Sequence, residues 1–224
     1  MTMRLTILND NIPSKGLLND WGWSVLVEER HRFLFDADTR GDVLAHNSKA
    51  LGISLKNLDF AVLSHWHGDH YGGFPLIGRL NPGLRLYAPS GGRIEGLSVF
   101  EVREAGEISD GIWTSGALDG FEQAVGIEAP SGLVIIVGCS HPGVDRLTEA
   151  ILRVSSYKKA HLVIGGFHYP SRKTLDRLAE MAEFIAPAHC SGDEAKAYMK
   201  RRYPEKFVEV RTGTVLEVEG VPAG

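Results

Sequence analysis

Histidines gather in one short stretch of this 224-residue chain, residues 62–73, which reads "VLSHWHGDHYGG". Three of the nine histidines (His65, His67 and His70) lie there, with Asp69, inside six residues. Imidazole and carboxylate groups together suit zinc and similar divalent metals. His65 and His67 are two residues apart, so on an extended segment both rings project to the same side. The pattern predicts a metal site that serves one ion or divides between two.

Other histidines follow strand-like runs elsewhere in the chain. His141 lies in "VGCSHPG", His168 in "VIGGFHYP" and His189 in "APAHCSG". Each follows an apolar run and precedes turn residues, so the three can converge at one end of a sheet, where loops of α/β proteins carry chemistry. The remaining histidines have no such context and are predicted to be structural: His31, His46 and His161.

The composition limits what this site can serve. Hydrophobic residues make up 43% of the chain and charged residues 23%, as in ordinary soluble proteins. The net charge of -4 argues against nucleic-acid binding through a basic face. No apolar run approaches membrane-spanning length, and the N-terminus lacks a signal-peptide core. Two cysteines cannot form a disulfide framework, so we expect a reduced, cytoplasmic protein without a membrane association.

Short apolar runs alternate with amphipathic segments, which predicts one α/β domain over residues 1–224. Helices are expected over residues 42–53, 143–157 and 171–185, the last with Ser171 as its N-cap. A β-rich middle is expected over residues 81–117, and a hairpin over residues 122–140. Further strands are expected over residues 4–10, 23–29, 31–39, 58–65, 160–168 and 208–219.

The motif His65-x-His67-x-Asp69-His70 resembles the metal-binding signature of the metallo-β-lactamase-fold superfamily. The segments "GCSHPG", "IGGFH" and "PAHCSG" resemble the branch named after 7,8-dihydropterin-6-methyl-4-(β-D-ribofuranosyl)aminobenzene 5'-phosphate synthase. These matches are spread from about residue 9 to residue 192. The resemblance implies a four-layer αββα sandwich, in which two mixed sheets lie face to face and the metals sit in a cleft at one edge.

The resemblance also implies a ligand set. His65, His67 and His141 would hold a first metal, and Asp69, His70 and His189 a second. Asp36, at the end of the strand "FLFDADT", would orient the ligands without binding a metal. The implied cofactor is one or two divalent ions, zinc first, with iron or manganese as alternatives.

The chain departs from the superfamily at one position. Many members carry a bridging aspartate where this chain has Gly138-Cys139. Cys139 could contribute a thiolate, His141 could reach both metals, or a solvent hydroxide could be the only bridge. Glu122 is a further candidate, although the interpretation we favour from sequence is a solvated carboxylate.

Such a site predicts a hydrolase that attacks an ester, lactone, thioester or phosphoester of a small molecule through a metal-activated hydroxide. Asp69 is the candidate to take the proton of the attacking water, and His168 the candidate to contact the substrate or leaving group. Arg172 and Lys173 could contact a phosphate, but a solvated helix start explains them as well.

Two alternatives come from other classes of protein. One is a transferase or synthase that joins a dihydropterin to a phosphorylated ribofuranosyl-aminobenzene, as the name of the branch suggests. The other is a non-catalytic protein that holds metal and binds a ligand. The expected partner is a small-molecule substrate rather than a nucleic acid, and the sequence leaves the oligomeric state open.

Overall fold

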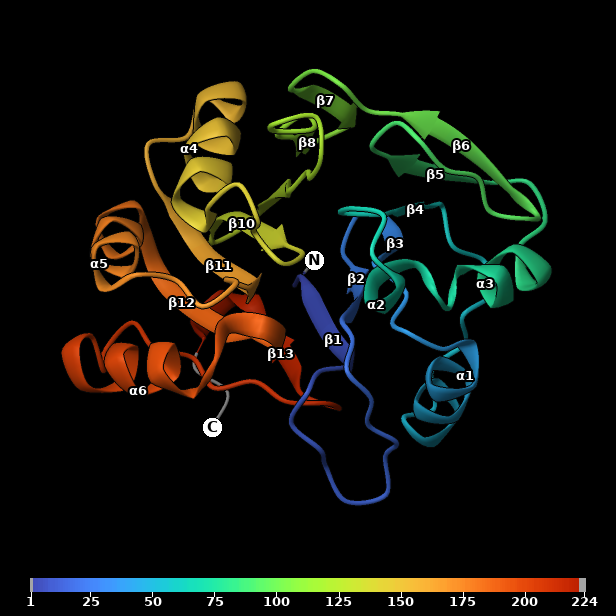
Figure 1. Ribbon diagram of the computed structural model, residues 1–224, viewed down its shortest axis with the longest axis horizontal. Coiled ribbons are helices and arrows are strands. Elements are labelled where there is room, and N and C mark those ends of the chain that lie inside the picture. The colour runs from blue at the N-terminus through green and yellow to red at the C-terminus, as the bar shows by residue number, and fades with distance from the viewer. Residues whose placement is uncertain (1, 222–224) are drawn as a thin grey trace.

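The computed structural model describes residues 2–221 and contains two sheets (Figure 1). The first, in order, is β13 (Val215–Glu217), β1 (Arg4–Asn9), β2 (Ser24–Glu28), β3 (Arg32–Phe35), β4 (Phe60–Val62), β5 (Leu84–Ala88) and β6 (Leu97–Glu101). The second is β12 (Ala182–Ala188), β11 (Ala160–Gly166), β10 (Gly132–Val137), β9 (Val125–Ala129), β8 (Ile112–Thr114) and β7 (Gly106–Ser109).

Both sheets are mixed. Strands β3 to β6 pair in parallel, and so do β10 to β12. The remaining pairs in each sheet are antiparallel. Parallel neighbours end on the same side of their sheet, so the loops that follow β3 and β4, and those that follow β10 to β12, are grouped.

Helices cover the outer face of each sheet. On the right in Figure 1, α1 (Gly41–Ala50) and α3 (Phe74–Leu80) pack on the first sheet, and the one-turn α2 (Gly68–Tyr71) lies near the centre. On the left, α4 (Val144–Ser155), α5 (Arg172–Met181) and α6 (Asp193–Arg202) pack on the second. Two short 3-10 turns are η1 (His189–Ser191) and η2 (Val218–Gly220). Among residues 2–221 no helix is long and apolar enough to cross a membrane.

A hydrophobic core between the sheets completes the four layers. Strand β10 contributes side chains to two hydrophobic cores. Val134 and Ile136 point between the sheets. The alternate residues pack against the helices: Leu133, Ile135 and Val137. Such alternation is the two-residue period of a strand, and each side chain buried this way contributes about 1.5–3 kcal/mol. The αββα sandwich predicted from the sequence is confirmed.

Two segments differ from the prediction. The helix expected over residues 171–185 begins correctly, with the Ser171 hydroxyl accepting the Thr174 N–H, but it ends at Met181. Residues 182–188 instead form β12 because they pair in parallel with β11, and this pairing overrides the helical spacing. In the closing stretch 208–219 only Val215–Glu217 is a strand. Helix α6, after the last histidine, was not predicted.

Candidate metal centre

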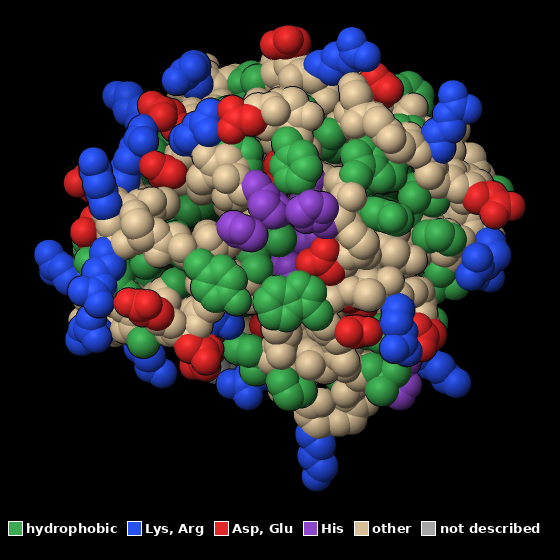
Figure 2. Space-filling model, viewed as in Figure 1, with side chains coloured by type: hydrophobic (Ala, Val, Ile, Leu, Met, Phe, Trp, Pro, Cys, Tyr) green, Lys and Arg blue, Asp and Glu red, His purple; other side chains and the backbone are tan. Residues whose placement is uncertain are grey.

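The predicted site residues come from loops that follow strands of both sheets. Asp36 follows β3, His65 follows β4, His141 follows β10, His168 follows β11, and η1 with His189 follows β12. The structure brings these loops together at one edge of the sandwich. In Figure 2 the histidine side chains gather near the centre of one face, bordered by hydrophobic side chains and an acidic one.

Donor atoms form three overlapping groups, within each of which they lie no more than 4.8 Å from one another. The groups are Asp69, His70, Cys139 and His189; His65, Cys139 and His141; and Cys139, His168 and Cys190. His67 is in none of them, but its ring centre lies 4.6 Å from that of His65 and 4.9 Å from that of His141. All the predicted ligands therefore lie in one cluster.

Four of these histidines use Nδ1 for a protein contact and leave Nε2 for the centre. The acceptors of Nδ1–H are Ser64 Oγ for His65 (2.9 Å), Asp36 Oδ2 for His70 (2.6 Å), Glu122 Oε2 for His141 (2.8 Å) and Asn11 Oδ1 for His189 (3.1 Å). Metal-binding histidines almost always engage their second ring nitrogen in this way. It fixes the tautomer whose Nε2 lone pair is available.

The Nε2 atoms of His65 and His189 are buried and have no hydrogen-bond donor among the described residues. Asp69 Oδ2 lies 3.3 Å from His189 Nε2, but with the proton on Nδ1 both atoms offer lone pairs and do not satisfy each other. An unsatisfied buried polar atom costs about 1–3 kcal/mol, so these two atoms need a partner. Burial lowers the pKa of His65 and of His189, which keeps both rings neutral, the form that binds a metal. Nitrogen, carboxylate and thiol donors around neutral imidazoles fit a divalent transition metal.

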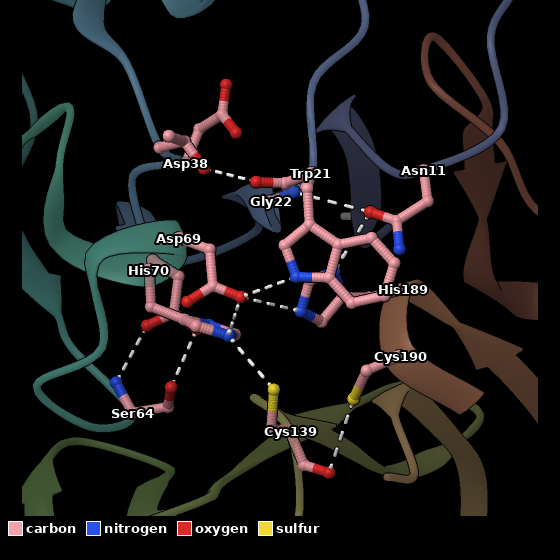
Figure 3. Close-up of polar contacts among 12 residues, drawn as sticks. Asn11, Trp21, Gly22, Asp38, Ser64, Asp69, His70, Cys139, His189 and Cys190 are labelled. Carbon is pink, nitrogen blue, oxygen red and sulfur yellow. Dashed lines mark hydrogen bonds and ion pairs between the residues drawn. The ribbon is translucent and has the colours of Figure 1, made fainter. Parts of the chain in front are cut away.

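The Asp69 carboxylate faces the rings of Trp21, His70 and His189, as Figure 3 shows. Its Oδ2 accepts the indole N–H of Trp21 at 3.0 Å and lies 3.3 Å from His189 Nε2 and 3.7 Å from His70 Nε2. Burial alone would raise the pKa of Asp69, but the contact with His189 and the charge of His70 outweigh it and lower that pKa. The carboxylate is therefore ionised at neutral pH.

Asp36 is fully buried behind the signature. It accepts the Ser64 N–H (2.7 Å), the Ser64 hydroxyl (2.7 Å) and the His70 Nδ1–H. Burial raises the pKa of Asp36, and the facing His70 offsets this only in part. Burial would lower the pKa of His70, yet the charge of Asp36 raises it overall. Asp36 thus contacts His70, a predicted ligand, and lies outside the donor groups.

Glu122 corrects the interpretation from sequence. Its side chain is fully buried rather than solvated. The carboxylate accepts the backbone N–H groups of Cys139 (2.8 Å), Ser140 (2.7 Å) and His141 (2.8 Å), and the Nδ1–H of His141. It holds the loop after β10 in place and orients His141.

His168 is exposed at the rim, with its ring centre 4.3 Å from that of His141. Its backbone has φ +48°, and His189 has φ +45°, a strained region for a residue with a Cβ. Gly166, two residues before His168, serves packing. A Cβ on Gly166 would lie 2.5 Å from Gly138 O and 2.8 Å from Cys190 Sγ, so this glycine allows close packing of the strands and of Cys190.

Three exposed aromatic side chains around the cluster were not singled out from the sequence. Trp21, Phe121 and Tyr169 are 51%, 37% and 69% exposed. Their ring centres lie 5.2 Å from His189, 5.2 Å from His141 and 6.3 Å from His168, respectively. Exposed apolar side chains that gather around one site often mark a ligand-binding region, but no short motif marks these three because they come from three separate loops. We call these three residues the aromatic rim.

The remaining candidates lie outside the cluster. His31 contacts Ser109, His46 contacts the Gly16 carbonyl, and His161 contacts Glu183 and the Val218 carbonyl. None of the three belongs to a donor group.

Arg172, one of the two residues considered for a phosphate contact, lines a groove of about 220 Å³ beside the cluster. Tyr169 and Tyr198 line the same groove, and the Arg172 guanidinium lies over the Tyr198 ring. It also lies 3.4 Å from Glu194 Oε1, an exposed ion pair. Lys173 is exposed and does not line the groove.

The sequence matches a family model described as the metallo-beta-lactamase superfamily over residues 22–189. It is 25% identical to the 7,8-dihydropterin-6-methyl-4-(beta-D-ribofuranosyl)-aminobenzene-5'-phosphate synthase of Methanocaldococcus jannaschii, over 88% of this chain and 89% of that protein.

Among solved structures, a metal-dependent hydrolase of the beta-lactamase superfamily superposes with a TM-score of 0.79 at 26% identity, over 96% of this chain and 98% of the other. The zinc-bound PqqB of Methylobacterium extorquens gives a TM-score of 0.61 at 11% identity, over 95% of this chain and 99% of the other. The second likeness concerns the fold alone.

Proposed function

Because the chain belongs to the metallo-beta-lactamase superfamily, we propose that it is a metal-dependent hydrolase of a small ester, lactone, thioester or phosphoester. One observation carries the proposal. Four buried or half-buried histidines fix Nδ1 on protein acceptors and turn Nε2 to a common centre, where two of these atoms have no partner among residues 2–221. A divalent cation, which accepts lone pairs from several imidazoles at once, would satisfy them together.

The residues divide into two sets that would each hold one ion. His65, His67 and His141 form one set, and Asp69, His70 and His189 the other. When bound, divalent ions supply Lewis-acid polarisation of a substrate oxygen and activation of water. We propose zinc, with iron or manganese as alternatives, because the donors mix nitrogen with carboxylate oxygen.

Asp69 is the residue proposed to handle the proton. Its carboxylate is ionised, half-buried and held by the Trp21 indole N–H, so Oδ2 is oriented toward His70 and His189. His168 is proposed to contact the substrate or leaving group, since it stands at the exposed rim next to His141. Burial, followed by the charge of His141, lowers the pKa of His168, so its ring is neutral at pH 7 and can donate one hydrogen bond.

A specific observation also supports a second candidate, the joining of a dihydropterin to a phosphorylated ribofuranosyl-aminobenzene. The aromatic rim offers Trp21, Phe121 and Tyr169 as flat surfaces for aromatic rings. Arg172 lies in the groove beside Tyr169, where a guanidinium could contact a phosphate. The Methanocaldococcus jannaschii synthase matches nearly the whole chain, but at 25% identity.

In both candidates the partner is a small molecule, and we propose a cytoplasmic setting. An acidic chain with net charge -4 offers no broad attraction for nucleic acid. A third candidate, a non-catalytic metal-holding binder, differs from the others only in lacking turnover.

The test combines a screen with one substitution. Protein loaded with zinc, iron or manganese is assayed on chromogenic esters, lactones, thioesters and phosphoesters, beside a condensation assay with a dihydropterin diphosphate. Asp69→Asn keeps nearly the same shape, and at matched metal occupancy we expect turnover to fall about 10²–10⁴-fold. His31→Ala, away from the cluster, should leave turnover unchanged.

Each outcome separates the candidates. Hydrolysis that survives Asp69→Asn within about threefold removes Asp69 from the mechanism. Condensation without hydrolysis favours the synthase, and metal binding with neither reaction favours the binder. A protein that takes up no metal contradicts all three.

A further inference from the structure

Cys139 occupies a distinctive place in the cluster, because it is the residue that all three donor groups share. Its Sγ lies within 4.8 Å of donors from the Asp69–His70–His189 set and of donors from the His65–His141 set. To His70 Nε2 the distance is 3.1 Å. In Figure 3 the thiol stands directly below the His70 ring.

The backbone fixes this position. Cys139 is buried, two residues beyond β10, and its N–H is held by Glu122 Oε1 at 2.8 Å. The preceding Gly138 permits the approach: a Cβ there would lie 2.1 Å from Ser64 Oγ, so the loop after β10 packs directly on the loop after β4. The loop of the second sheet therefore places the Cys139 thiol next to the His65–His70 motif of the first sheet.

A second observation shows that this position faces a ligand. His65 Nε2 and His189 Nε2, each in a donor group with Cys139, are buried without a hydrogen-bond donor among the described residues. A neutral thiol is a weak donor and a weak acceptor, and cannot satisfy both nitrogens. A pair of cations between the thiol and the two nitrogens would satisfy all three atoms.

We infer that Cys139 is a ligand of the metal centre and that its thiolate is shared by the two ions. The inference rests on the proposed metal centre, although not on hydrolysis. On binding, the S–H proton leaves to solvent and the sulfur lone pairs bond the metals, so charge and atoms balance. It selects the thiolate among the three bridges that the sequence left open.

The shared thiolate also narrows the choice of metal ion. Soft sulfur ligands favour zinc, and cobalt or iron(II) after it, over manganese and magnesium, which prefer oxygen. An aspartate at the same place would lack this preference. We therefore expect Cys139→Asp to shift the relative affinity from zinc toward manganese.

Cys190 provides a matched control. It is also buried, and its Sγ lies 3.7 Å from the carbonyl oxygen of Cys139, toward which its S–H points. It shares a donor group with Cys139 and His168 but belongs to neither of the sets that would hold the two ions. Cys139 and Cys190 are thus similarly buried, but the Cys139 thiol faces His70 whereas the Cys190 thiol faces a backbone carbonyl.

The experiment uses the full-length protein stripped with chelator and titrated with Co²⁺. A thiolate bound to cobalt gives a near-ultraviolet charge-transfer band, which depends on no substrate. We expect the band in the wild type and in Cys190→Ser, and its loss in Cys139→Ser and Cys139→Asp. Cys139→Ser should also weaken binding of the second equivalent at least about tenfold, since loss of a supporting contact outside the ligand shell already costs that much. Circular dichroism checks that each variant is folded.

The outcomes are distinct. Cobalt uptake without the band, or a band that survives Cys139→Ser, overturns the inference and leaves the hydrolase proposal standing. A band lost only in Cys190→Ser overturns it in favour of the other thiol. A band that behaves as expected, in a protein that hydrolyses nothing in the screen, supports the inference and contradicts the hydrolase. A protein that takes up no cobalt overturns both.

Discussion

Asp36 and Glu122 stand at the site edge of the two sheets, and each is a fully buried carboxylate surrounded by donors. Asp36 collects the Ser64 N–H, the Ser64 hydroxyl and the His70 ring. Glu122 collects three consecutive backbone N–H groups and the His141 ring. Asp36 holds the ring of His70 and the neighbouring Ser64, whereas Glu122 holds the whole loop from Cys139 to His141.

The difference lies in how the proposed site residues are supplied. On the first sheet they follow one another in the signature, so a single strand end and the one-turn α2 position them. On the second sheet the proposed ligands Cys139, His141 and His189 and the proposed substrate contact His168 come from three strand ends, and each end needs its own support. Glu122 provides this for the first of these loops, because a buried carboxylate can accept several N–H groups that the loop cannot satisfy internally.

The largest expected effect is that of Glu122→Ala. It leaves three buried backbone N–H groups without an acceptor, and we expect the free energy of unfolding to fall by about 3–5 kcal/mol. The measurement is chemical denaturation in the presence of chelator, so that metal binding does not contribute. Glu180→Ala, on the exposed side of α5, is the control and should change stability by less than about 0.5 kcal/mol. A loss below about 1 kcal/mol for Glu122→Ala would show that the loop holds itself.

These contrasts explain what could be predicted. The signature could be read because its residues are contiguous and follow a buried strand. Asp36 could be assigned through the family resemblance. Glu122 was wrongly assigned because the local sequence suggests a solvated turn. The hairpin register, however, could have indicated its true position. In the β9–β10 hairpin Val125 pairs with Ile136, and three more residues along that register bring Glu122 opposite Cys139. A register argument from the predicted turn would have found it.

Other features could not be found this way. The aromatic rim consists of residues from three loops, whose proximity follows only from the packing of the two sheets. The boundary at Met181 depends on the pairing of β12 with β11, a contact between residues far apart in sequence. Local spacing carries no information about either.

An intermediate effect is expected when each carboxylate becomes an amide. In Asp36→Asn and Glu122→Gln, the amide N–H₂ must face either a ring N–H or a backbone N–H that the carboxylate accepted, so His70 or His141 loses its fixed orientation or its tautomer. Loss of such a supporting contact typically costs about 10–100-fold in metal affinity. We expect Asp36→Asn to weaken the ion held with Asp69 and His189, and Glu122→Gln the ion held with His65. Zinc titration against a competing chelator measures both affinities.

Glu180→Gln serves as the control for this pair, since it makes the same chemical change on the surface. If Asp36→Asn and Glu122→Gln weaken the same ion by the same factor, the two halves of the cluster do not act as separate sites. That result would favour a single metal held by both sheets.

The smallest expected effect concerns a third buried carboxylate, Asp38, which lacks the full set of donors that Asp36 and Glu122 have. Asn9 donates to its Oδ1 at 2.8 Å, but its Oδ2 has no partner among the described residues. Burial raises the pKa of Asp38 to about 7. Between its unfolded value of 3.8 and that pKa, the folded protein binds more protons than the unfolded chain. The free energy of unfolding therefore falls as pH rises through this window and levels off above it.

From pH 6 to pH 8 we expect this fall to be about 1.4 kcal/mol, one pKa unit's worth of free energy. Asp38→Asn cannot titrate, so its stability should lack this component while the wild type shows it. Denaturation of both proteins in chelator, at matched ionic strength and at several pH values, measures the difference. If the two stability curves run parallel from pH 6 to pH 8, Asp38 is ionised throughout. Burial with one unpartnered oxygen would then not be enough to keep a proton on this carboxylate.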